Sequence, residues 1–389
     1  MRVTVVGGGV AGTVSAIALR RIGAEVTIVE AHPDPGGEVG SFVSLAVNGL
    51  RGLAAIDCLD RVRGRGMEIA RLRLWSAKGR VIADVPRGRR AADPLRSVTL
   101  MRGHLVAELR AAAREAGATI VTGDRFVGTS PLASGVAARF ASGRVDGCDL
   151  LVGADGLHSV TRSVLDPAGP APRYSGVWVI SGRSPGAQEP SAEGAFNLTV
   201  GAHGAFVHAA AAGSADVWWQ AQVNSPTRPD LAGVPDATWL ARLDTLYAAE
   251  PVARRIIAAT TRLHRPSVNH LLGPVATWHD AQTVIVGDAA HPVGAGQGAS
   301  MAIEDGLALA HALAGAGSVA GGLRDYDRAR RPRVTKVLQA SDDNREVKQA
   351  GAIRRRATEI GMRLVFERVY ERATGWLYDV PAPSAPGGD

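Results

Sequence analysis

The order of apolar and polar residues at the start of the chain predicts a strand, a helix and a second strand. An apolar run at residues 2–6 leads into three glycines, and a second apolar run at residues 25–30 ends on Glu30. Short apolar runs bounded by turn residues are typical of buried strands. Residues 1–30 are therefore expected to form a βαβ unit, the building block of a parallel sheet.

Helical spacing of apolar residues predicts further helices near residues 49–59 and at residues 98–116. In the second of these, four residues fall on one helical face: Leu105, Leu109, Ala112 and Ala116. Strands are expected after it near Thr119, Val136 and Val145, and at residues 150–152. This part of the chain therefore mixes parallel strands with a small β-meander.

The pattern changes between residues 173 and 223, where short strand-like runs are separated by Gly, Ser and Pro, as in antiparallel sheets. The expected strands are residues 176–181, 196–200, 205–209 and 216–223. After them we expect helices at 237–247 and 252–259, a strand at 283–286, a helix at 298–313 and basic amphipathic helices to Tyr370.

These elements predict an α/β fold: a Rossmann-like nucleotide-binding domain with an inserted antiparallel-sheet substrate domain and C-terminal helices. A chain of 389 residues is longer than one core usually supports, so two domains are expected. The predicted limits are residues 1–172 and 273–345 for the two parts of the nucleotide domain, 173–272 for the substrate domain, and 346–389 for the C-terminal helices and tail.

Composition favours a cytoplasmic protein that binds no metal. Only two cysteines occur, Cys58 and Cys148, and neither has a metal-ligand spacing or implies a disulfide framework. The first strand begins after Met1, which leaves no room for a signal peptide. No apolar run approaches the ~20 residues of a membrane span.

The net charge of +7 and the isoelectric point near 10.0 raise the question of nucleic acid. The arginines are scattered, with local clusters at residues 87–90 and 354–356, and no aromatic residues interleave them. A solvated surface is the better interpretation, and no nucleic-acid partner is expected. The positive field can still attract an anionic nicotinamide cofactor or an acidic substrate.

The glycine-rich turn after the first strand has the spacing of a dinucleotide-binding site. Gly7 permits a tight turn, Gly9 lets the backbone approach a pyrophosphate, and Gly12 lets the helix pack on the sheet. The helix N-terminus then offers amide donors and a positive dipole end to the phosphates. Glu30 supplies the carboxylate that accepts hydrogen bonds from the ribose hydroxyls.

Two later segments also leave apolar strands through glycine. One is Gly153-Ala154-Asp155-Gly156, and the other is Gly287-Asp288-Ala289-Ala290-His291-Pro292. A single long dinucleotide that touches all three segments would account for the set.

In this order and covering nearly the whole chain, the three segments, with Arg162 and the run Gly296-Gln297-Gly298, closely resemble the class A flavoprotein monooxygenases. These are the single-component aromatic hydroxylases typified by para-hydroxybenzoate hydroxylase. The resemblance implies a noncovalent FAD. The positions that match the family's FAD site are Gly7, Gly9, Ala11, Gly12, Glu30, Ser44, Arg102, Asp155, Asp288, Gly298, Ala299 and Ser300.

The resemblance also implies a role for several of these residues. Arg102 would contact the FAD phosphate and ribityl region, and Asp288 the ribityl hydroxyls. The helix from Gly298 would aim its amides at the pyrimidine edge, which stabilises the negative charge of reduced flavin. Asp155 belongs to a segment that the family uses for FAD and the nicotinamide cofactor, although a helix-capping turn explains it too.

The implied reaction is cofactor chemistry. NADPH or NADH reduces FAD, reduced FAD reacts with dioxygen to form a hydroperoxide, and one oxygen atom enters an aromatic or polycyclic small molecule. No side chain is assigned as catalytic. Two departures from the family pattern affect the flavin surroundings: the loop from Val293 to Gly296 is shorter and lacks a proline, and Val47 stands where a proline commonly precedes Asn48-Gly49.

Substrate-chamber candidates come from the predicted antiparallel sheet: Arg183, His208, Trp218, Trp219 and Gln220. Because side chains alternate along a strand, only one of Trp218 and Trp219 can face the chamber. For His208, a satisfied position in the sheet competes with a role as catalytic base. For His291, a packing role beside the flavin loop is favoured.

Three functions remain open at this stage. The first is an FAD- and NAD(P)H-dependent monooxygenase, compatible with secondary metabolism and with a monomer or homodimer. The second is a flavin-dependent epoxidase, decarboxylating enzyme or oxidase on a related substrate; halogenation is disfavoured because no WxWxIP motif occurs. The third is a flavin-binding protein without turnover.

Overall fold

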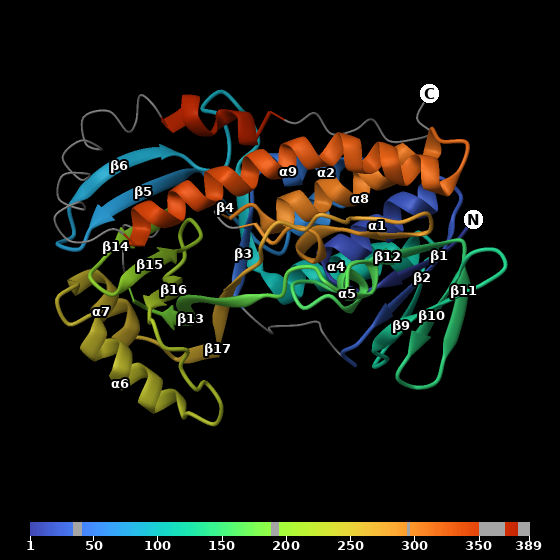
Figure 1. Cartoon of the computed structure of the whole chain (residues 1–389). Helices are drawn as coiled ribbons and strands as arrows, with labels where there is room; N and C mark the ends of the chain where they lie inside the picture. Colours follow the sequence, from blue (N-terminus) through green and yellow to red (C-terminus); the bar gives the residue numbers. More distant parts are fainter. Residues whose placement is uncertain (34–40, 188–193, 294–295, 350–369, 380–389) are drawn as a thin grey trace.

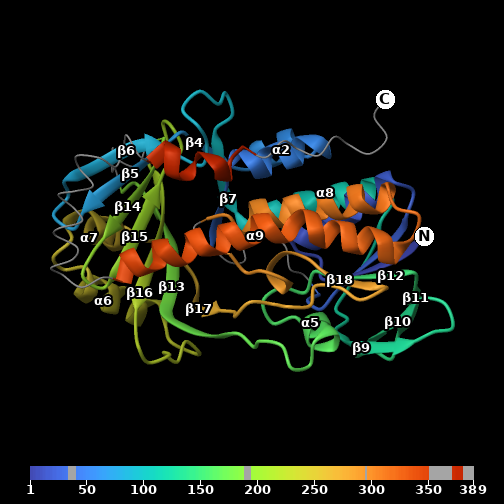
Figure 2. The same cartoon turned by 45° about the horizontal axis from the view of Figure 1, so that its top comes forward.

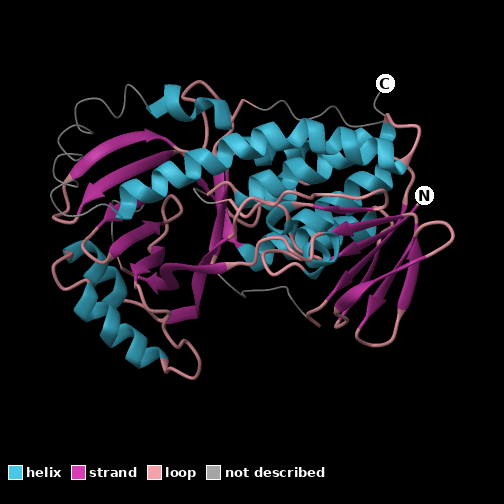
Figure 3. Ribbon diagram, viewed as in Figure 1, coloured by secondary structure: helices cyan, strands magenta, loops and turns pink. Residues whose placement is uncertain are grey.

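The structure, a computed structural model, describes residues 1–33, 41–187, 194–293, 296–349 and 370–379, with side chains to residue 341 in the last long helix. Its strands gather into two main sheets near opposite ends of the molecule (Figure 3). One is a parallel sheet covered by helices, and the other is largely antiparallel. This arrangement confirms the predicted fold class.

The parallel sheet carries the glycine-rich turns at its carboxyl edge. Its order is β18 (Thr283–Ile285), β12 (Leu150–Gly153), β1 (Arg2–Val6), β2 (Glu25–Glu30) and β8 (Thr119–Thr122), and all of its pairs are parallel. Val5, Ile28 and Val152 are fully buried, as strands covered on both faces require. The turns after β1, β12 and β18 therefore meet at one edge, the usual place for ligands in an α/β sheet.

Helices cover one face of this sheet and a small antiparallel sheet covers the other (Figure 1). The helices are α1 (Val10–Arg21), α4 (Arg102–Glu115) and α8 (Gly298–Ala314), and α5 (Val160–Leu165) follows β12. The small sheet consists of β9 (Phe126–Pro131), β10 (Val136–Phe140) and β11 (Val145–Cys148). Phe126 and Phe140 pack edge to face beneath it.

A second small sheet joins the two lobes and corrects one prediction. It consists of β3 (Phe42–Leu45), β7 (Ser97–Met101) and β4 (Met67–Ile69), and α2 (Val47–Ala55) and α3 (Leu59–Arg63) follow β3. The predicted helix at 98–116 was wrong at its start, because residues 98–101 belong to β7. All five residues of β7 are buried between two partner strands, and the helix begins only at Arg102.

The largest sheet has seven strands. Its order is β17 (Arg262–Leu271), β13 (Arg173–Pro185), β16 (Asp216–Asn224), β15 (Gly204–Ala209), β14 (Ala195–Val200), β5 (Arg71–Ser76) and β6 (Val81–Pro86). Neighbours are antiparallel except β14 and β5, which pair in parallel. This sheet thus takes two strands from a part of the chain that precedes residue 173, so it extends beyond the predicted insertion at 173–272.

The long helix α9 (Val319–Gln349) runs from the parallel-sheet lobe to the seven-stranded sheet (Figures 1 and 2). Its 31 residues correspond to a length of about 46 Å. It passes residue 345 without a break, so the predicted limit between residues 345 and 346 lies inside one element. Within the described part of the chain, no helix is long and apolar enough to cross a membrane.

One face of the seven-stranded sheet is a closed core. The helices α6 (Asp236–Leu246) and α7 (Pro251–Ala258) cover it, and Trp219, fully buried, packs there against Phe206. The Trp219 indole nitrogen donates to Ser184 Oγ at 3.0 Å. The opposite face carries Trp218, whose ring lies 6.2 Å from that of Phe42 in β3.

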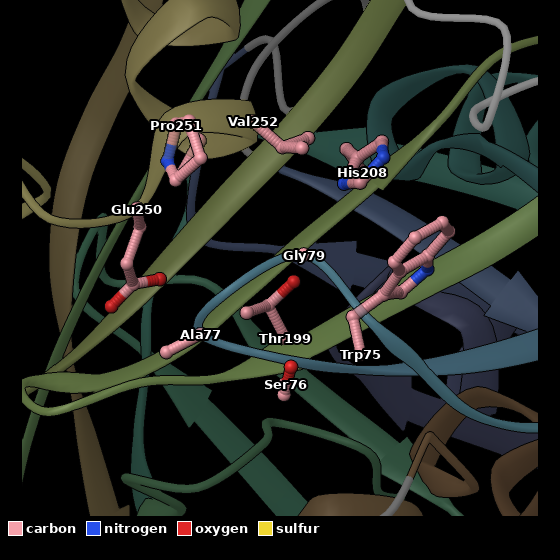
Figure 4. Close-up of a pocket in the computed structure, with 10 residues that line it drawn as sticks. Trp75, Ser76, Ala77, Gly79, Thr199, His208, Glu250, Pro251 and Val252 are labelled. Atoms are coloured by element: carbon pink, nitrogen blue, oxygen red, sulfur yellow. The ribbon is translucent and has the colours of Figure 1, made fainter.

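The helix-covered face also holds a buried acid, Glu250, which precedes α7. Figure 4 shows it with Trp75, Thr199 and His208 around a cavity of about 10 Å³, the space of about one water molecule. Glu250 Oε2 has no hydrogen-bond partner among the described residues. Burial raises the pKa of Glu250 to about 7, and a backbone hydrogen bond from Ala202 offsets this only in part.

This pKa predicts a pH-dependent contribution to stability. Between about pH 4.5 and pH 7 the folded protein holds a proton that the unfolded chain has released, so the free energy of unfolding should fall as pH rises through this window. Urea unfolding measures the free energy of unfolding at pH 5 and at pH 8. Between these two pH values, the free energy should fall less in Glu250→Gln than in the unmodified protein, and the two falls should differ by roughly 3 kcal/mol at most. The exposed Glu25→Gln is the control, and equal losses in all three proteins would contradict the assignment.

Candidate cofactor site and substrate face

The turn after β1 fits tightly against the turn after β12. Gly7 has a φ of +101°, and a Cβ at this position would lie 2.4 Å from the Ala154 carbonyl oxygen. A Cβ at Gly12 would lie 1.9 Å from the Gly7 carbonyl oxygen. These two glycines therefore permit the packing of β1, α1 and the 153–156 segment.

Gly9 differs from Gly7 and Gly12, because a Cβ at Gly9 would meet no atom within 4 Å. Gly9 is the N-cap of α1, and as a glycine it has no side chain that could cap the first amides of the helix. The first turn of α1 also carries no acid. The space beside Gly9, at the positive end of the helix dipole, is thus open. This is the arrangement that binds a pyrophosphate.

Glu30 lies beneath this turn with an arginine that the sequence analysis missed. Its carboxylate accepts hydrogen bonds from the amides of Gly8 at 2.8 Å and His32 at 2.9 Å. The buried Arg110 in α4 donates to the Gly8 carbonyl at 2.7 Å and to Glu30 at 3.2 Å. Glu30 therefore shapes the glycine turn itself, and its contact with a ribose stays a prediction.

Asp155 caps the helix α5 in this structure. Its carboxylate accepts hydrogen bonds from the Ser159 hydroxyl at 2.5 Å, the Thr161 amide at 2.9 Å and the Thr161 hydroxyl at 3.0 Å. The buried Arg162, in α5, donates to the carbonyl of Ala289 at 2.9 Å. The second glycine segment is thereby joined to the third, and a contact of Asp155 with a cofactor stays a prediction.

Asp288 stands at the third segment, directly in front of α8. Its side chain reaches open space, and a Cβ at Gly298 would lie 3.9 Å from its carboxylate. Although Asp288 is exposed to solvent, the chain packed around its carboxylate removes part of its hydration and raises its pKa, and the charges of His291 and Arg102 oppose that rise. The Asp288 carboxylate thus lies between the N-terminus of α8 and Arg102. This is a suitable position for an acceptor of hydrogen bonds from the ribityl hydroxyls of FAD.

Close packing brings the predicted residues at the start of α1 and α8 together. A Cβ at Gly287 would lie 2.8 Å from Ala11 Cβ, so the first and third segments touch. Ser300, fully buried, accepts a hydrogen bond at 3.2 Å from the Ala46 amide, just before α2. Gly298 and Ala299 are half-buried at the N-terminus of α8.

Ser44 and Arg102 lie on the side of the site nearer the seven-stranded sheet. The Ser44 hydroxyl is 2.7 Å from the Thr99 hydroxyl, so it ties β3 to β7. Arg102 begins α4 with an exposed side chain, and its amide donates to the Ser41 carbonyl at 3.2 Å.

Two adjacent acids in α8, Glu304 and Asp305, hold these segments from behind, and the sequence analysis missed them. Asp305 accepts from the Gly287 amide at 2.8 Å and from His291 Nε2 at 2.7 Å. Glu304 accepts from the Asn48 side chain at 2.7 Å. Two adjacent acids inside an otherwise apolar helix were the signal that could have found them.

Arginines of α9 balance both acids. Arg330 donates to Asp305 at 2.9 Å and to Glu304 at 2.7 Å, and Arg333 donates to Glu304 at 2.6 Å. Burial alone would raise the pKa of Asp305, but the charges of His291 and Arg330 hold it well below its usual range. Against its burial, the arginines lower the pKa of Glu304 as well. His291, with an exposed fraction of 2%, lies inside this network, and its packing role stays a prediction.

The seven-stranded sheet separates the substrate-chamber candidates. Arg183, Trp218 and Gln220 share the face directed at β3. Gln220 donates to the Ser41 hydroxyl at 2.9 Å, and the Arg183 guanidinium donates to Asp216 at 3.0 Å. We call this the substrate face.

Trp219 and His208 lie on the opposite, helix-covered face, where they are paired across β16 and β15. His208 has an exposed fraction of 1% and lines the small cavity beside Glu250 (Figure 4). The pairing register therefore places Trp218 on the substrate face, and it places Trp219 and His208 on the opposite face.

A family model described as an FAD binding domain matches residues 1–341. The chain belongs to the FAD-dependent class A flavoprotein monooxygenases. It is therefore an enzyme, with FAD as its cofactor.

Two relatives illustrate the similarity of this monooxygenase to characterised hydroxylases. A 3-amino-4-hydroxybenzoate 2-monooxygenase of Streptomyces platensis is 30% identical over 365 residues, which cover 87% of this chain and 86% of the relative. A 3-hydroxybenzoate 6-hydroxylase of Klebsiella oxytoca is 27% identical over 97% of this chain and 96% of its own length.

Solved structures share the fold of this monooxygenase. Klebsiella pneumoniae HpxO complexed with FAD and uric acid has a TM-score of 0.83 at 21% identity, covering 100% of this chain and 98% of that chain. The enzyme CtdE with FAD and a substrate has a TM-score of 0.78 at 21% identity and 90% coverage of both chains.

The residues of this chain fit FAD. The open space at Gly9 lies before the amides of α1, and Asp288 offers an exposed acceptor at the α8 N-terminus. Among the described residues there is no His, Cys, Asp and Glu cluster that could hold a metal ion.

Two glycine variants should separate cofactor binding from folding. Gly9 has a φ of −80°, which any residue adopts, so Gly9→Val should fold with an unfolding free energy, measured without FAD, within about 0.5 kcal/mol of the unmodified protein. Its side chain would occupy the pyrophosphate position, so FAD affinity should fall at least about tenfold. Fluorescence titration of the apoprotein with FAD measures this.

Gly12→Ala provides the comparison. Its Cβ would meet the Gly7 carbonyl, so the unfolding free energy itself should fall by about 1–3 kcal/mol. Normal FAD affinity in Gly9→Val would refute the placement of the pyrophosphate.

Proposed function

We propose that this enzyme uses NADPH or NADH and dioxygen to insert one oxygen atom into an aromatic or polycyclic small molecule. The observation that carries the proposal is the position of the substrate face, whose Gln220 is hydrogen-bonded to Ser41, one residue before the strand that holds Ser44. An aromatic substrate held there lies beside the FAD site. The relatives named above, a 3-amino-4-hydroxybenzoate 2-monooxygenase and a 3-hydroxybenzoate 6-hydroxylase, support this choice of substrate class.

The chain's own contribution is positioning, charge stabilisation and exclusion of water. When bound, FAD would supply the redox chemistry that carries electrons from the nicotinamide cofactor to dioxygen. The amides at the N-terminus of α8 would stabilise negative charge on the reduced ring. Phe42 and Trp218 would line the substrate side with apolar surface, which keeps water from the reactive oxygen.

The segment from Gly153 to Gly156 is our proposed place for the transient visit of the nicotinamide cofactor. A Cβ at Gly156 would meet no atom within 4 Å, so this turn is open to a ligand. Arg162 links it to the turn that carries Asp288, so a cofactor that docks there stands close to the flavin segment.

Labelling with heavy dioxygen tests the reaction type. In a screen of aromatic compounds, the true substrate should accelerate NAD(P)H oxidation by at least about tenfold, equivalent to roughly 1.4 kcal/mol of barrier. The product should carry one labelled oxygen atom. Label from water alone, or an oxidised product without label, would contradict monooxygenation and favour the oxidase function.

Asp288→Asn serves as the control for the site. It retains the shape of the side chain but removes the charge, so it should lower FAD retention and substrate-stimulated turnover together. A variant with full FAD occupancy and normal turnover would show that Asp288 does not hold the cofactor.

A further inference from the structure

The start of α2, residues 46–49, is fixed to the N-terminal part of α8. The Ala46 amide donates to the Ser300 hydroxyl at 3.2 Å. The Asn48 side chain donates to the buried Glu304 at 2.7 Å. This stretch follows directly on β3, the strand for which we predict a contact with FAD. The position of residues 46–49 therefore affects how the chain passes the cofactor site.

The last described part of the chain, residues 370–379, packs against the same stretch. We call it the C-terminal segment, and Figure 2 shows it in red beside α2. Tyr378, with an exposed fraction of 6%, forms a small apolar cluster with Ala46 and the fully buried Val47. The Tyr378 carbonyl accepts a hydrogen bond at 2.7 Å from Arg51, one turn further along α2. A residue more than 300 positions away thus supports the start of α2.

Two further contacts hold the C-terminal segment in place. Arg90 Nε, in the loop after β6, donates to the Asp379 carboxylate at 2.6 Å. A Cβ at Gly375 would lie 2.7 Å from the Arg90 guanidinium, so the absence of a side chain leaves room for this ion pair. The Lys336 ammonium of α9 lies 4.1 Å from the centre of the Trp376 ring. The segment is therefore held by specific contacts at both its charged and its aromatic residues.

Arg333 of α9 connects the C-terminal segment to the helix behind the cofactor site. It donates to the Leu377 carbonyl at 2.9 Å and to Glu304 at 2.6 Å. Glu304 is also the acid that accepts from Asn48. The start of α2, α8, α9 and the C-terminal segment therefore form a closed ring of contacts. In such a ring, the loss of one link leaves the elements on either side of it less well fixed.

We propose that the C-terminal segment is a clamp that holds residues 46–49 in the position that FAD binding requires, with Tyr378 as its positioning residue. A loop that is already fixed in its bound conformation has less entropy to lose when the ligand arrives, so the clamp raises the affinity for FAD. The proposal needs the FAD cofactor and the predicted contact at β3. It is independent of the substrate and of the reaction proposed above.

Thermodynamic linkage gives this proposal a second consequence. If the docked segment strengthens FAD binding by some factor, bound FAD must strengthen docking of the segment by the same factor. A segment that only stabilises the fold has no such reciprocal dependence on the cofactor. Docking of the segment measured with and without FAD therefore distinguishes a clamp from a purely structural element.

A protein that ends at residue 369 and a synthetic peptide of residues 370–389 test both directions. Fluorescence titration of the apoprotein with FAD should give a Kd at least about tenfold higher for the shortened protein than for the full chain. Saturating peptide should restore the affinity. Fluorescence anisotropy of a dye-labelled peptide should show tighter binding to the FAD-loaded shortened protein than to its apoprotein, by the same factor.

Two substitutions in the full chain decide the matter if the shortened protein does not fold or the peptide does not bind. Tyr378→Ala removes the ring from Ala46 and Val47, so the Kd for FAD should rise at least about tenfold while circular dichroism remains that of the folded protein. Tyr378→Phe keeps the ring and should keep the Kd. Arg372→Gln, an exposed position of the same segment, is the control and should also leave the Kd unchanged.

An unchanged Kd for FAD in a folded Tyr378→Ala protein, or in a folded protein that ends at residue 369, would overturn the proposal. A peptide that binds equally well with and without FAD would do the same. Equal weakening in Tyr378→Phe and Tyr378→Ala would contradict the role of the ring. None of these results depends on whether oxygen from dioxygen enters a product, so the proposed function stands or falls separately.

Discussion

The ion pairs between two adjacent carboxylates of α8 and the arginines of α9 hold the cofactor site together. Asp305 fixes the turn of the third glycine segment through the Gly287 amide and His291, and Glu304 fixes α2 through Asn48. Arg330 spans both acids. Breaking one partner of such a buried network is costly, because it leaves the other charge desolvated and unpaired. The three glycine segments, far apart in sequence, thereby keep one relative placement.

The same helices connect the cofactor site to the substrate lobe. α9 carries Arg330 and continues to the seven-stranded sheet, while Arg333 also donates to the Leu377 carbonyl. On the substrate face, Gln220 joins Ser41, whose carbonyl accepts from Arg102. Under the proposed function, a substrate that displaced either contact would act on residues beside the proposed flavin site. Substrate arrival and the cofactor would then be coupled through these two hydrogen bonds.

Residues whose role depends on local backbone geometry could be predicted from the sequence. The tight turn at Gly7, the close packing of Gly12 and the open space at Gly9 were predicted from the glycine spacing, whereas the contact of Gly7 with Ala154 needed the structure. The strand at 98–101 was predicted as helix, because its apolar spacing fits either period and only its two partner strands decide. Alternation along the strand predicts that Trp218 and Trp219 face opposite ways. Which of them lies on the substrate face could be decided only from the pairing register with β13.

Residues whose role depends on distant partners could not be predicted. Arg110, Glu304 and Arg330 act through residues 25 to 256 positions away. The parallel pairing of β14 with β5 joins segments separated by more than 100 residues, and no local pattern indicates it. For Asp155, the capping role could be foreseen from turn chemistry, and the structure supplies the partners.

The most direct test of this account is the affinity of the apoprotein for FAD when Arg330 is changed to lysine. A lysine keeps the positive charge but cannot span both carboxylates. If the network positions the flavin segments, FAD titration should show a Kd at least about tenfold higher, while circular dichroism remains that of the folded protein. Arg328→Lys, an exposed position of the same helix paired with Asp325, should leave the Kd unchanged. An unaltered FAD affinity in a folded Arg330→Lys protein would contradict the central role of the buried network.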